Sequence, residues 1–421
     1  MRKIYNSLFI PLARLAGELG KLISPKFRLR ESGSKNSLGI LDKLGNSGPK
    51  IWFHAASVGE FEQAKPVIEL LKKENPDLKI IVSFFSPSGY ENQKNYEFAD
   101  AVIYLPFDTS SNASMLLDKM KPDAAVFVRY EFWLNYFSEI KSRGIPLFMI
   151  NATIPGKTKP HDNKFLLKYY KECLDNFTEI FTTGDRHSEY FRNIDIDAEI
   201  TSLSDTRFDR IMEKVRSESD NAILSKNFFD NNSFVLVASS SWEPDEEMII
   251  NAYNHYGSDK FKKLKIIFTP HEPEEKNISR IRESISGTVL LSEIESGSSI
   301  RNTHIIVDSI GKLLQLYRYA DAAHIGGAFG AGVHSVTEPA GYGIPLSTGP
   351  RMKNSPDAIE LNKSGALKIN IDGKTFSEWL TEIMENEDKR SEYSKKAKDY
   401  VESGIGSSLR IADRIISEIK K

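Results

Sequence analysis

The sequence predicts an α/β protein with two Rossmann-like domains, each built around a parallel sheet. Three observations support this fold class. Short apolar, β-branched or aromatic runs alternate with longer amphipathic patterns along the 421 residues, and continuous apolar strands between helices are typical of parallel sheets covered on both faces. A charged and polar stretch at 206–230 separates the runs into two sets. A glycine-rich turn follows the last run and leads into a helical pattern.

Eleven strands are expected from these runs. The first domain contains six of them, at 51–54, 80–84, 101–105, 124–128, 147–150 and 180–183. The second domain contains five, at 234–238, 264–268, 289–291, 304–307 and 322–325. No self-similar repeat of about 20–50 residues and no low-complexity tract interrupts the pattern.

The same pattern divides the chain into five parts, and a chain of this length is expected to hold two or three domains. The parts are an amphipathic, membrane-associated N-terminal segment (1–30), a first Rossmann-like domain (31–205), a linker with a boundary helix (206–230), a second Rossmann-like domain (231–388) and a C-terminal helix that packs back across both domains (389–421).

The composition narrows the function classes. The formal net charge of −2 gives no global basic field, so nucleic acid is not an expected partner. The single cysteine, Cys173, excludes an intramolecular disulfide framework and a cysteine-based zinc cluster, which fits a reducing cytoplasm. No run of about 18 apolar residues is present, so a hydrophobic spanning helix is not expected.

The N-terminal segment has a basic amphipathic pattern. Apolar residues recur at spacings of three and four, which places them on one helical stripe: Ile4, Leu8, Leu12, Leu15, Leu19 and Leu22. The basic residues around this stripe are Arg2, Lys3, Arg14, Lys21, Lys26, Arg28 and Arg30. Such a segment can lie at the surface of an anionic membrane, and the alternative is a terminal helix packed on its own domain. Pro11 would kink the helix or mark its start.

The most informative stretch is Gly326–Ala340, which follows the last expected strand. Its glycines, including Gly327 and Gly332, indicate a tight turn, and a short helix is expected to open near Ser335. A helix N-terminus presents backbone N–H groups and a positive dipole end, which suits a phosphate. Glu338 lies one turn further on, where a carboxylate could accept from a ribose diol. An acid in a first helical turn can also simply complement the dipole, so both interpretations stand.

The segment that follows the first expected strand carries a carboxylate at the sheet edge. Ser57 and Gly59 let the chain turn tightly into a helix, which puts Glu60 in its first turn. A carboxylate at this position could deprotonate a substrate hydroxyl as a general base. Ser57 with Glu60 three residues on also matches a capping box, in which the carboxylate caps the helix. The sequence leaves both roles open.

Three further segments follow expected strands. Arg129–Asn135 carries Glu131 and Trp133, which suggest contact with an acceptor, although a buried core tryptophan fits equally well. Ser239–Ser241 open a helix in the second domain, where hydroxyl groups bind phosphate or cap the helix. His271 follows the next strand and could line a base or phosphate pocket.

No metal site is expected. Asp195-Ile196-Asp197 matches a D-x-D metal motif but lies in a loop without a strand end beside it. The histidines lack the spacing of metal ligands, and no G-x-G-x-x-G fingerprint follows the first strand, which argues against NAD.

Nine segments, taken in order, resemble the Kdo (3-deoxy-D-manno-octulosonic acid) transferases of lipopolysaccharide synthesis. The resemblance covers nearly the whole chain, and its specificity lies in the ordered set. The segments are HAASVGE (54–60), SPSGYE (86–91), LPFD (105–108), YEFWLN (130–135), NATI (151–154), DTRFDR (205–210), ASSSWEPDEE (238–247), GKLLQLY (311–317) and GG…HSVTEPAGYGIP (326–345).

The resemblance implies a GT-B glycosyltransferase, with two Rossmann-like domains facing a cleft, that moves Kdo from CMP-Kdo to the lipid A precursor (lipid IVA) with inversion and releases CMP. Glu60 would be the general base and Glu131 a second acid, with Ser57 and Gly59 at the substrate. No metal or cofactor would take part. The protein would sit at the cytoplasmic face of the bacterial inner membrane, as a peripheral or monotopic protein held through its N-terminal segment. The residues implied to hold CMP are Ser239, Ser240, Ser241, His271, Gly327, Gly332, His334, Ser335 and Glu338.

The chain departs from its relatives at several points. The hydrophobic anchor of many relatives is short and interrupted here, Ser335 stands where relatives often have asparagine, and Arg129 stands where many carry an acid. Leu134 replaces a common proline. Two alternatives remain: another GT-B enzyme that uses a UDP-sugar and a lipid acceptor, and a non-catalytic nucleotide-binding protein of the membrane surface. The number of Kdo residues added, the acyl preference and the oligomeric state are not predicted.

Overall fold

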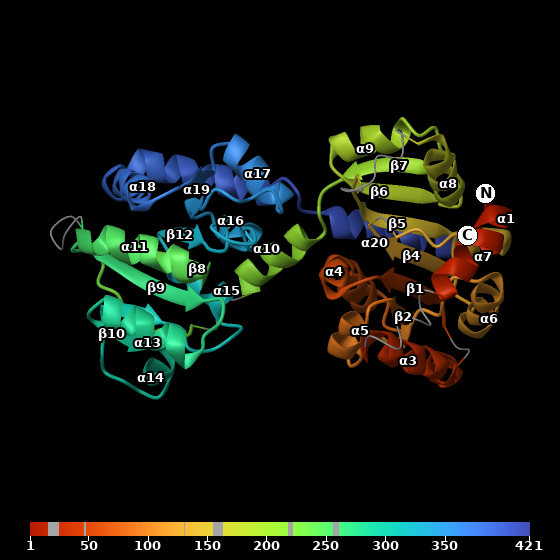
Figure 1. The fold of residues 1–421 in the computed structure, drawn as a ribbon, viewed down its shortest axis with the longest axis horizontal. Helices are drawn as coiled ribbons and strands as arrows, with labels where there is room; N and C mark the ends of the chain where they lie inside the picture. The colour runs from red at the N-terminus through yellow and green to blue at the C-terminus, as the bar shows by residue number, and fades with distance from the viewer. Residues whose placement is uncertain (16–24, 46–47, 130, 155–162, 218–221, 256–260) are drawn as a thin grey trace. The chain divides into compact units, whose positions relative to one another are not determined.

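The computed structural model describes residues 1–15, 25–45, 48–129, 131–154, 163–217, 222–255 and 261–421. These residues form two compact units (Figure 1). Unit 1 comprises Met1–Asp209 together with Gly404–Lys421, and unit 2 comprises Arg210–Ser403. The chain therefore crosses from unit 1 to unit 2 and later returns, and each unit contains its own parallel sheet.

The sheet of unit 1 has the strand order β3-β2-β1-β4-β5-β6-β7, with parallel pairing throughout. Its strands are β1 (Lys50–Ala55), β2 (Lys79–Phe84), β3 (Ala101–Tyr104), β4 (Ala124–Val128), β5 (Leu147–Ala152), β6 (Glu179–Thr183) and β7 (Glu199–Leu203). The helices around it are α3 (Pro25–Asp42), α4 (Val58–Glu74), α5 (Pro87–Gln93), α6 (Ser110–Met120), α7 (Leu134–Ser142), α8 (Lys164–Leu174), α9 (Asp185–Arg192) and α20 (Ser407–Ile419).

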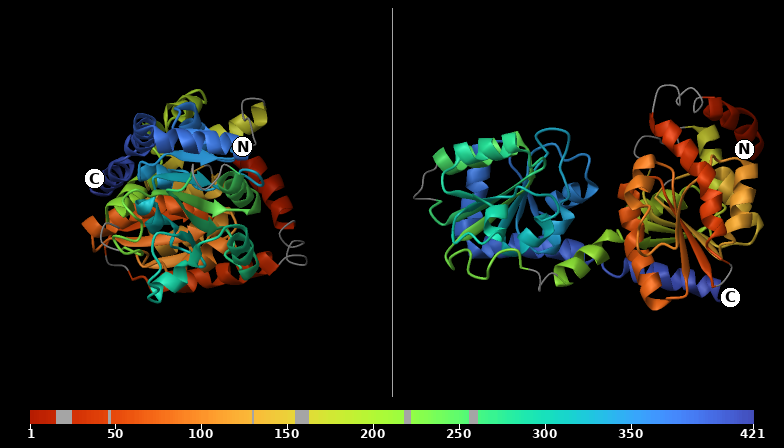
Figure 2. Two further views of the ribbon diagram at one scale, coloured as in Figure 1. Left: turned by 90° about the vertical axis from the view of Figure 1, so that its left-hand side faces the viewer. Right: turned by 90° about the horizontal axis from the view of Figure 1, so that it is seen from below.

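Both faces of this sheet are buried, which explains why its strands are continuous apolar runs. Side chains alternate between the two faces of a strand. In β1, Trp52 accordingly packs into one core cluster, whereas Ile51 and Phe53 pack into the other. Helix α20, from the far end of the chain, covers the second face through Ile411 and Ile415 and runs beside the unit 1 strands in Figure 2.

The sheet of unit 2 repeats this arrangement, with the order β10-β11-β9-β8-β12-β13-β14. Its strands are β8 (Phe234–Ser241), β9 (Leu264–Pro270), β10 (Thr288–Leu290), β11 (His304–Ile306), β12 (Ala322–Ile325), β13 (Leu346–Thr348) and β14 (Leu367–Ile369). Its helices include α11 (Glu243–His255), α13 (Glu275–Ser284), α14 (Leu291–Glu295), α15 (Leu313–Leu316), η3 (Tyr317–Tyr319), α16 (Thr337–Gly341), α17 (Pro356–Lys363), α18 (Gly373–Glu385) and α19 (Glu387–Glu402).

The predicted α/β fold class is confirmed, and all eleven predicted strands are present, although several ends differ. The sequence analysis missed β7, β13 and β14. Strand β7 lies at the sheet edge and is mostly half-buried, so its sequence, Glu-Ile-Thr-Ser-Leu, lacks a continuous apolar run. Strands β13 and β14 are three residues long each, and polar residues interrupt both: Ser347 and Thr348 in β13, and Lys368 in β14.

Helix α10 (Arg207–Ser217) carries the chain out of unit 1. Its first turn is tied to that unit, because the Asp209 carboxylate accepts from the backbone N–H of Gly406 at 2.6 Å and of Ser408 at 2.8 Å. The last segment of the chain contains two helices, α19 in unit 2 and α20 in unit 1. The motif residues around 205–210 therefore hold the point where the chain leaves unit 1 and the point where it returns.

The N-terminal helix docks on unit 1 through one side only. It begins with α1 (Arg2–Ile4) and the π-helical turn η1 (Tyr5–Phe9), so it does not start at Pro11. A π-turn just before a proline fits the loss of a backbone donor at that residue. Tyr5 is buried and its hydroxyl donates to the Asp108 carboxylate at 2.8 Å.

The opposite side of this helix carries the apolar stripe, defined here as Ile4, Leu8, Leu12 and Leu15. These side chains are 48–60% exposed. One side of the helix therefore packs on its own domain, and the other side leaves the apolar stripe exposed. Leu19 and Leu22 lie outside the described residues. Among the residues that the structure describes, no helix combines the length and apolar character needed to cross a membrane.

Candidate active site

The strand order of unit 1 reverses at β1, which pairs with β2 on one side and with β4 on the other. Ligands of open α/β sheets bind outside the carboxyl ends of the strands at such a switch point. Ser57, Gly59 and Glu60 follow β1, and Glu131 follows β4. The fold thus places all four predicted unit 1 residues at the switch point.

Glu60 caps α4, as one of the two sequence interpretations requires. Its Oε2 accepts from the backbone N–H of Ala56 at 2.7 Å and of Ser57 at 3.2 Å, and the Ser57 hydroxyl accepts from the Glu60 N–H. No bond from a described residue engages Oε1. Capping therefore orients the carboxylate while leaving one oxygen for chemistry.

The two carboxylates of this edge are coupled. Burial raises the pKa of Glu60, against the opposing effects of the Ala56 N–H and the Arg129 charge. Burial and repulsion from Glu60 together raise the pKa of Glu131 to about 7, and the nearby Trp133 indole opposes this. Glu131 therefore holds a proton for part of the time at neutral pH.

Gly59 has no steric reason to be glycine. It is exposed in the first turn of α4, and a Cβ there would meet open space. Arg129, in contrast, adopts a left-handed φ of 65° directly after β4, which is uncommon for a residue other than glycine. Its charge lies near Glu60, so this edge also holds a cation.

The strand order of unit 2 reverses at β8, which lies between β9 and β12. Ser239–Ser241 end β8, His271 follows β9, and the glycine-rich loop follows β12. The predicted nucleotide residues therefore gather at the switch point of the second sheet, as the residues around Glu60 do in the first.

The three serines differ in what their hydroxyls do. Ser239 bonds the buried Tyr317 hydroxyl, and Ser241 donates to Glu246 at 2.7 Å. Ser240 is half-buried with a left-handed φ of 44°, and its N–H donates to the Thr269 hydroxyl. Only the Ser240 hydroxyl is left without a bond to a described residue.

The glycine-rich loop is closely packed. Gly327 has a φ of 94°, and a Cβ there would come within 2.5 Å of the Gly332 carbonyl oxygen. Gly332 has a φ of 136°, with Asn354 in the place that a Cβ would occupy. These positions require glycine both for the backbone angle and for space.

Asp245 joins this loop to the end of β8. It accepts from the backbone N–H of Gly327 at 2.9 Å and of Trp242 at 3.0 Å, and its other oxygen lies 3.3 Å from Nε2 of the buried His324. Burial would raise the pKa of Asp245, but these hydrogen bonds outweigh it and hold the pKa below its usual value.

The helix after the loop starts later than predicted. The sequence analysis expected it to open near Ser335, but α16 begins at Thr337 and has five residues. Ser335 is exposed before it, with its hydroxyl 3.4 Å from that of Thr337. The backbone N–H groups of Gly330, Gly332 and His334 bond carbonyls within the loop, which keeps these residues out of the helix. Glu338 is half-buried near Tyr317, whose pKa is raised by burial and by the Glu338 charge.

A stacked group of rings, missed as a group by the sequence analysis, lies at this edge. Trp242 stacks on His271 with ring centroids 4.7 Å apart, and His271 stacks on His334 at 4.4 Å. The Trp242 indole N–H donates to Nε2 of His334 at 3.0 Å. Burial and the adjacent His271 lower the pKa of His334, so the ring is neutral and carries its proton on Nδ1. Trp242 is 39% exposed, which leaves an aromatic surface for a ligand.

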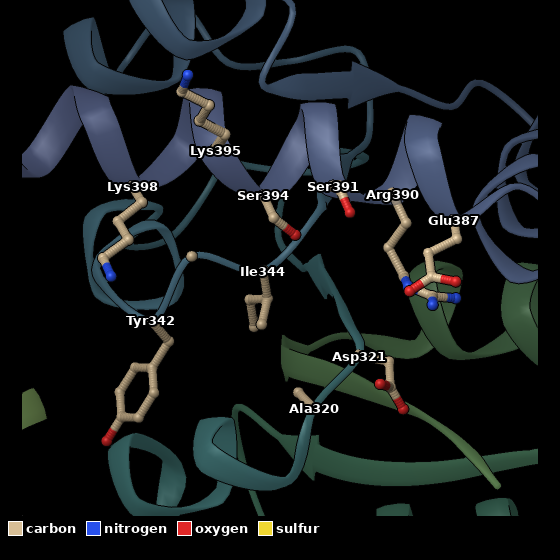
Figure 3. Close-up of a pocket in the computed structure, with 11 residues that line it drawn as sticks. Ala320, Asp321, Tyr342, Ile344, Glu387, Arg390, Ser391, Ser394, Lys395 and Lys398 are labelled. Carbon is tan, nitrogen blue, oxygen red and sulfur yellow. The ribbon is translucent and has the colours of Figure 1, made fainter. Parts of the chain in front are cut away.

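A pocket of about 540 Å³ in unit 2 lies elsewhere (Figure 3). Asp321 precedes β12 and Ile344 precedes β13, so it opens at the amino ends of these strands. Arg390 and Lys398 of α19 also line it. The predicted nucleotide residues follow the carboxyl ends of the strands and take no part in it. Asp195 and Asp197 also lie at an amino edge, before β7.

Comparison with known proteins shows which family the chain is similar to. Residues 31–210 match the family model described as 3-deoxy-D-manno-octulosonic-acid transferase (kdotransferase). The transferase of that name from Chlamydia trachomatis serovar D is 24% identical over 381 residues, which cover 88% of this chain and 86% of the relative. The one from Haemophilus influenzae is 23% identical over 98% of this chain and 97% of the relative.

The chain is similar to the Kdo transferases, both over residues 31–210 and along most of its length. It is therefore a glycosyltransferase. Among solved structures, UDP-GlcNAc 2-epimerase from Neisseria meningitidis, bound to UDP-GlcNAc, is similar with a TM-score of 0.60 and 15% identity, over 88% of this chain and 100% of that chain. MurG of Acinetobacter baumannii has a TM-score of 0.54 and 14% identity over 88% and 100%. These likenesses establish the GT-B fold.

Proposed function

We propose that this chain is a Kdo transferase that moves Kdo from CMP-Kdo to the lipid A precursor with inversion, releasing CMP, as a step in assembly of the lipopolysaccharide core. The observation that carries this proposal is the pair of coupled carboxylates at the switch point of unit 1. Acceptor activation needs a base, and this edge holds one carboxylate oriented by two backbone N–H groups. The family and its named relatives supply the class of sugar transferred.

In this mechanism Glu60 is the base. Its ionised carboxylate accepts the proton of an acceptor hydroxyl while that oxygen forms a bond to the anomeric carbon of Kdo. The bond from this carbon to the phosphate oxygen of CMP breaks, and CMP leaves with the electron pair. Glu131, with its pKa near 7, lies beside Glu60, and its protonation relieves the repulsion between the two carboxylates.

The donor is proposed to bind at the carboxyl edge of unit 2. The exposed ring of Trp242 offers a surface on which the cytosine base stacks. Neutral His334 presents its Nδ1–H, and the Ser240 hydroxyl is a further donor for the phosphate of CMP. These groups stabilise a phosphate leaving group through hydrogen bonds, so we propose that neither a metal ion nor a cofactor is needed.

The apolar stripe supports a membrane location. Four large apolar side chains, about half exposed, face away from unit 1 on a helix that Tyr5 fixes in place. Burying such side chains in the headgroup region of a bilayer is favourable, and neighbouring basic residues attract anionic lipids. We therefore propose peripheral attachment at the cytoplasmic face of the inner membrane, where the lipid acceptor lies.

The deciding experiment is transfer of labelled Kdo, with CMP-Kdo made in situ, onto tetraacylated lipid A precursor. Glu60→Gln is the key variant because glutamine retains the capping acceptor but cannot serve as the base. We expect its rate to fall about 100- to 10,000-fold with CMP binding intact. Glu74→Gln, at the exposed far end of α4, should match the wild type.

Each other outcome would change a specific part of the proposal. Equal rates for wild type and Glu60→Gln would keep the reaction and remove Glu60 as the base. A folded wild type that binds UDP in preference to CMP would instead favour a GT-B enzyme that uses a UDP-sugar. Binding of CMP without any transfer, and without any effect of Glu60 variants, would favour a non-catalytic protein.

A further inference from the structure

Three buried nitrogen atoms at the carboxyl edge of unit 1 lack a hydrogen-bond partner among the described residues. They are Nε of Arg30, Nε2 of His54 and Nε of Arg129. Buried polar atoms are nearly always hydrogen-bonded, and leaving a donor unsatisfied is costly. The concentration of such atoms around the acidic pair therefore calls for a ligand.

Arg30, Trp133 and His54 form a continuous group with Phe85. The Arg30 guanidinium stacks on Phe85, with its carbon 3.7 Å from the ring centroid. Phe85 packs against Trp133 at 4.8 Å between centroids, and Trp133 packs against His54 at 5.9 Å. These residues come from α3, the turn after β2, the turn after β4 and the end of β1. Only the folded chain brings them together, beside Glu131.

His54 adds a fully buried neutral ring to this group. It is 0% exposed, and burial lowers the pKa of its ring to about 3. The Ser83 hydroxyl lies 2.8 Å from Nδ1 and 3.5 Å from the Phe53 carbonyl. A hydrogen bond to the Ser83 backbone also holds the ring. Its Nε2 is one of the three atoms without a partner.

Arg30 supplies the charge. The sequence analysis counted it among the basic residues around the N-terminal helix, but the structure places it half-buried on Phe85. Burial lowers the pKa of Arg30 only to about 10, so it is cationic at neutral pH. No described carboxylate lies within ion-pair distance of it. A half-buried guanidinium held flat by an aromatic ring is suited to bidentate binding of a phosphate.

We propose that Arg30, held on Phe85, binds a phosphate group of the acceptor. This inference rests on the proposed function, in which a phosphorylated glucosamine lipid is the acceptor. The nucleotide residues belong to unit 2, whereas this group adjoins Glu131 and Glu60 within unit 1. Binding of the acceptor phosphate by Arg30 orients the sugar so that its hydroxyl meets the base.

The test compares the full-length wild type with Arg30→Gln and Arg30→Lys. We expect Arg30→Gln to raise the acceptor KM about 10- to 100-fold while the KM for CMP-Kdo stays the same. Arg30→Lys keeps the charge but loses the planar fork, so an intermediate value is expected. Lys43→Gln, exposed just beyond the end of α3, is the matched control and should leave both KM values unchanged.

Acceptors from which each phosphate has been removed in turn test which phosphate group Arg30 binds. With one of these acceptors, wild type and Arg30→Gln should become equally poor. A rise in the KM for CMP-Kdo instead would assign Arg30 to the donor, whose Kdo also carries a carboxylate, and would overturn the proposal. Equal KM values for wild type and Arg30→Gln on the intact acceptor would overturn it too.

Direct binding separates this inference from the proposed function. Titration of the intact and the dephosphorylated lipid in detergent micelles into the full chain needs no transfer. A phosphate-dependent gain in affinity that Arg30→Gln abolishes supports the site even if Kdo is not the sugar. The absence of such a gain in the wild type would overturn the site even if Kdo transfer is observed.

Discussion

The carboxyl edges of the two sheets share a topology but carry opposite chemistry. In unit 1 the switch point between β1 and β4 presents two coupled carboxylates, both with a raised pKa. In unit 2 the switch point between β8 and β12 presents a closely packed glycine loop, a free hydroxyl and a neutral histidine. One edge is suited to accepting a proton, and the other to holding an anion. The comparison shows that topology fixes where a site forms, while residue type fixes what it does.

The largest expected effect that would test this contrast is at the glycine loop. Gly327→Ala should abolish measurable CMP binding and destabilise unit 2 by about 2–4 kcal/mol, because the new Cβ meets the Gly332 carbonyl at a left-handed backbone angle. Isothermal titration with CMP and urea unfolding would measure both effects. Gly59→Ala, in open space on unit 1, provides the steric comparison and should leave stability within about 0.5 kcal/mol. Normal CMP binding by Gly327→Ala would contradict the packing argument.

The acidic pair predicts a pH dependence of stability. The pKa of Glu131 is raised from 4.5 to about 7 in the folded protein. The folded state therefore favours the protonated acid. This stabilising contribution is fully present below pH 4.5 and is lost as the pH rises through 7. The free energy of unfolding of Glu131→Gln, relative to that of the wild type, should therefore rise by about 2 kcal/mol between pH 5 and pH 8.

Urea unfolding at both pH values would measure this change, with Glu74→Gln as the control that shows no such trend. A difference between Glu131→Gln and wild type that does not vary with pH would mean that the two carboxylates are not coupled as the geometry indicates.

The ring stack of unit 2 should give a smaller effect. Trp242→Ala removes the stacking surface and the donor to His334, so CMP affinity should fall by about 1–2 kcal/mol. Trp242→Phe keeps the stacking surface and loses the donor, so its CMP affinity should lie between those of the wild type and Trp242→Ala. Titration with CMP measures this. Unchanged affinity in Trp242→Ala would place the base elsewhere on the edge.

Metal removal should have no effect. Transfer rates after exhaustive EDTA dialysis and with EDTA in the assay should stay within about twofold of the untreated enzyme, because hydrogen bonds can stabilise the leaving group. If the rate fell and added Mg²⁺ or Mn²⁺ restored it, the carboxyl edge of unit 2 would need a cation to stabilise the phosphate of CMP.

Much of this arrangement was accessible from the sequence because the strands are buried on both faces and so form continuous apolar runs. The turns that follow these strands then identified the site residues, since parallel strands end at one edge. Glu60 illustrates the limit of this reasoning. Its capping bonds and its proposed role as a base coexist, because the two carboxylate oxygens have different environments.

Contacts between distant segments were not accessible. Nothing in the sequence around Arg30 indicates that it stacks on Phe85, or that Trp242 and His334 meet across about 90 residues of chain. The serine triplet was also ambiguous, because Ser239 and Ser241 turn their hydroxyls to Tyr317 and Glu246 rather than outward. Such outcomes depend on tertiary packing, which residue types and spacing do not encode locally.

Each chemical edge is built within a single unit, and this has an evolutionary consequence. Asp245 holds the glycine-rich loop of unit 2, and Glu60 and Glu131 form the acidic pair of unit 1. The described side chains that build one site take no part in the other. Mutations that alter nucleotide preference can therefore accumulate in one half of the gene without disturbing proton abstraction in the other. Donor and acceptor specificity can diverge at separate rates, and exchange between related genes of the segment that encodes Arg210–Ser403 could replace one specificity while the other is inherited intact.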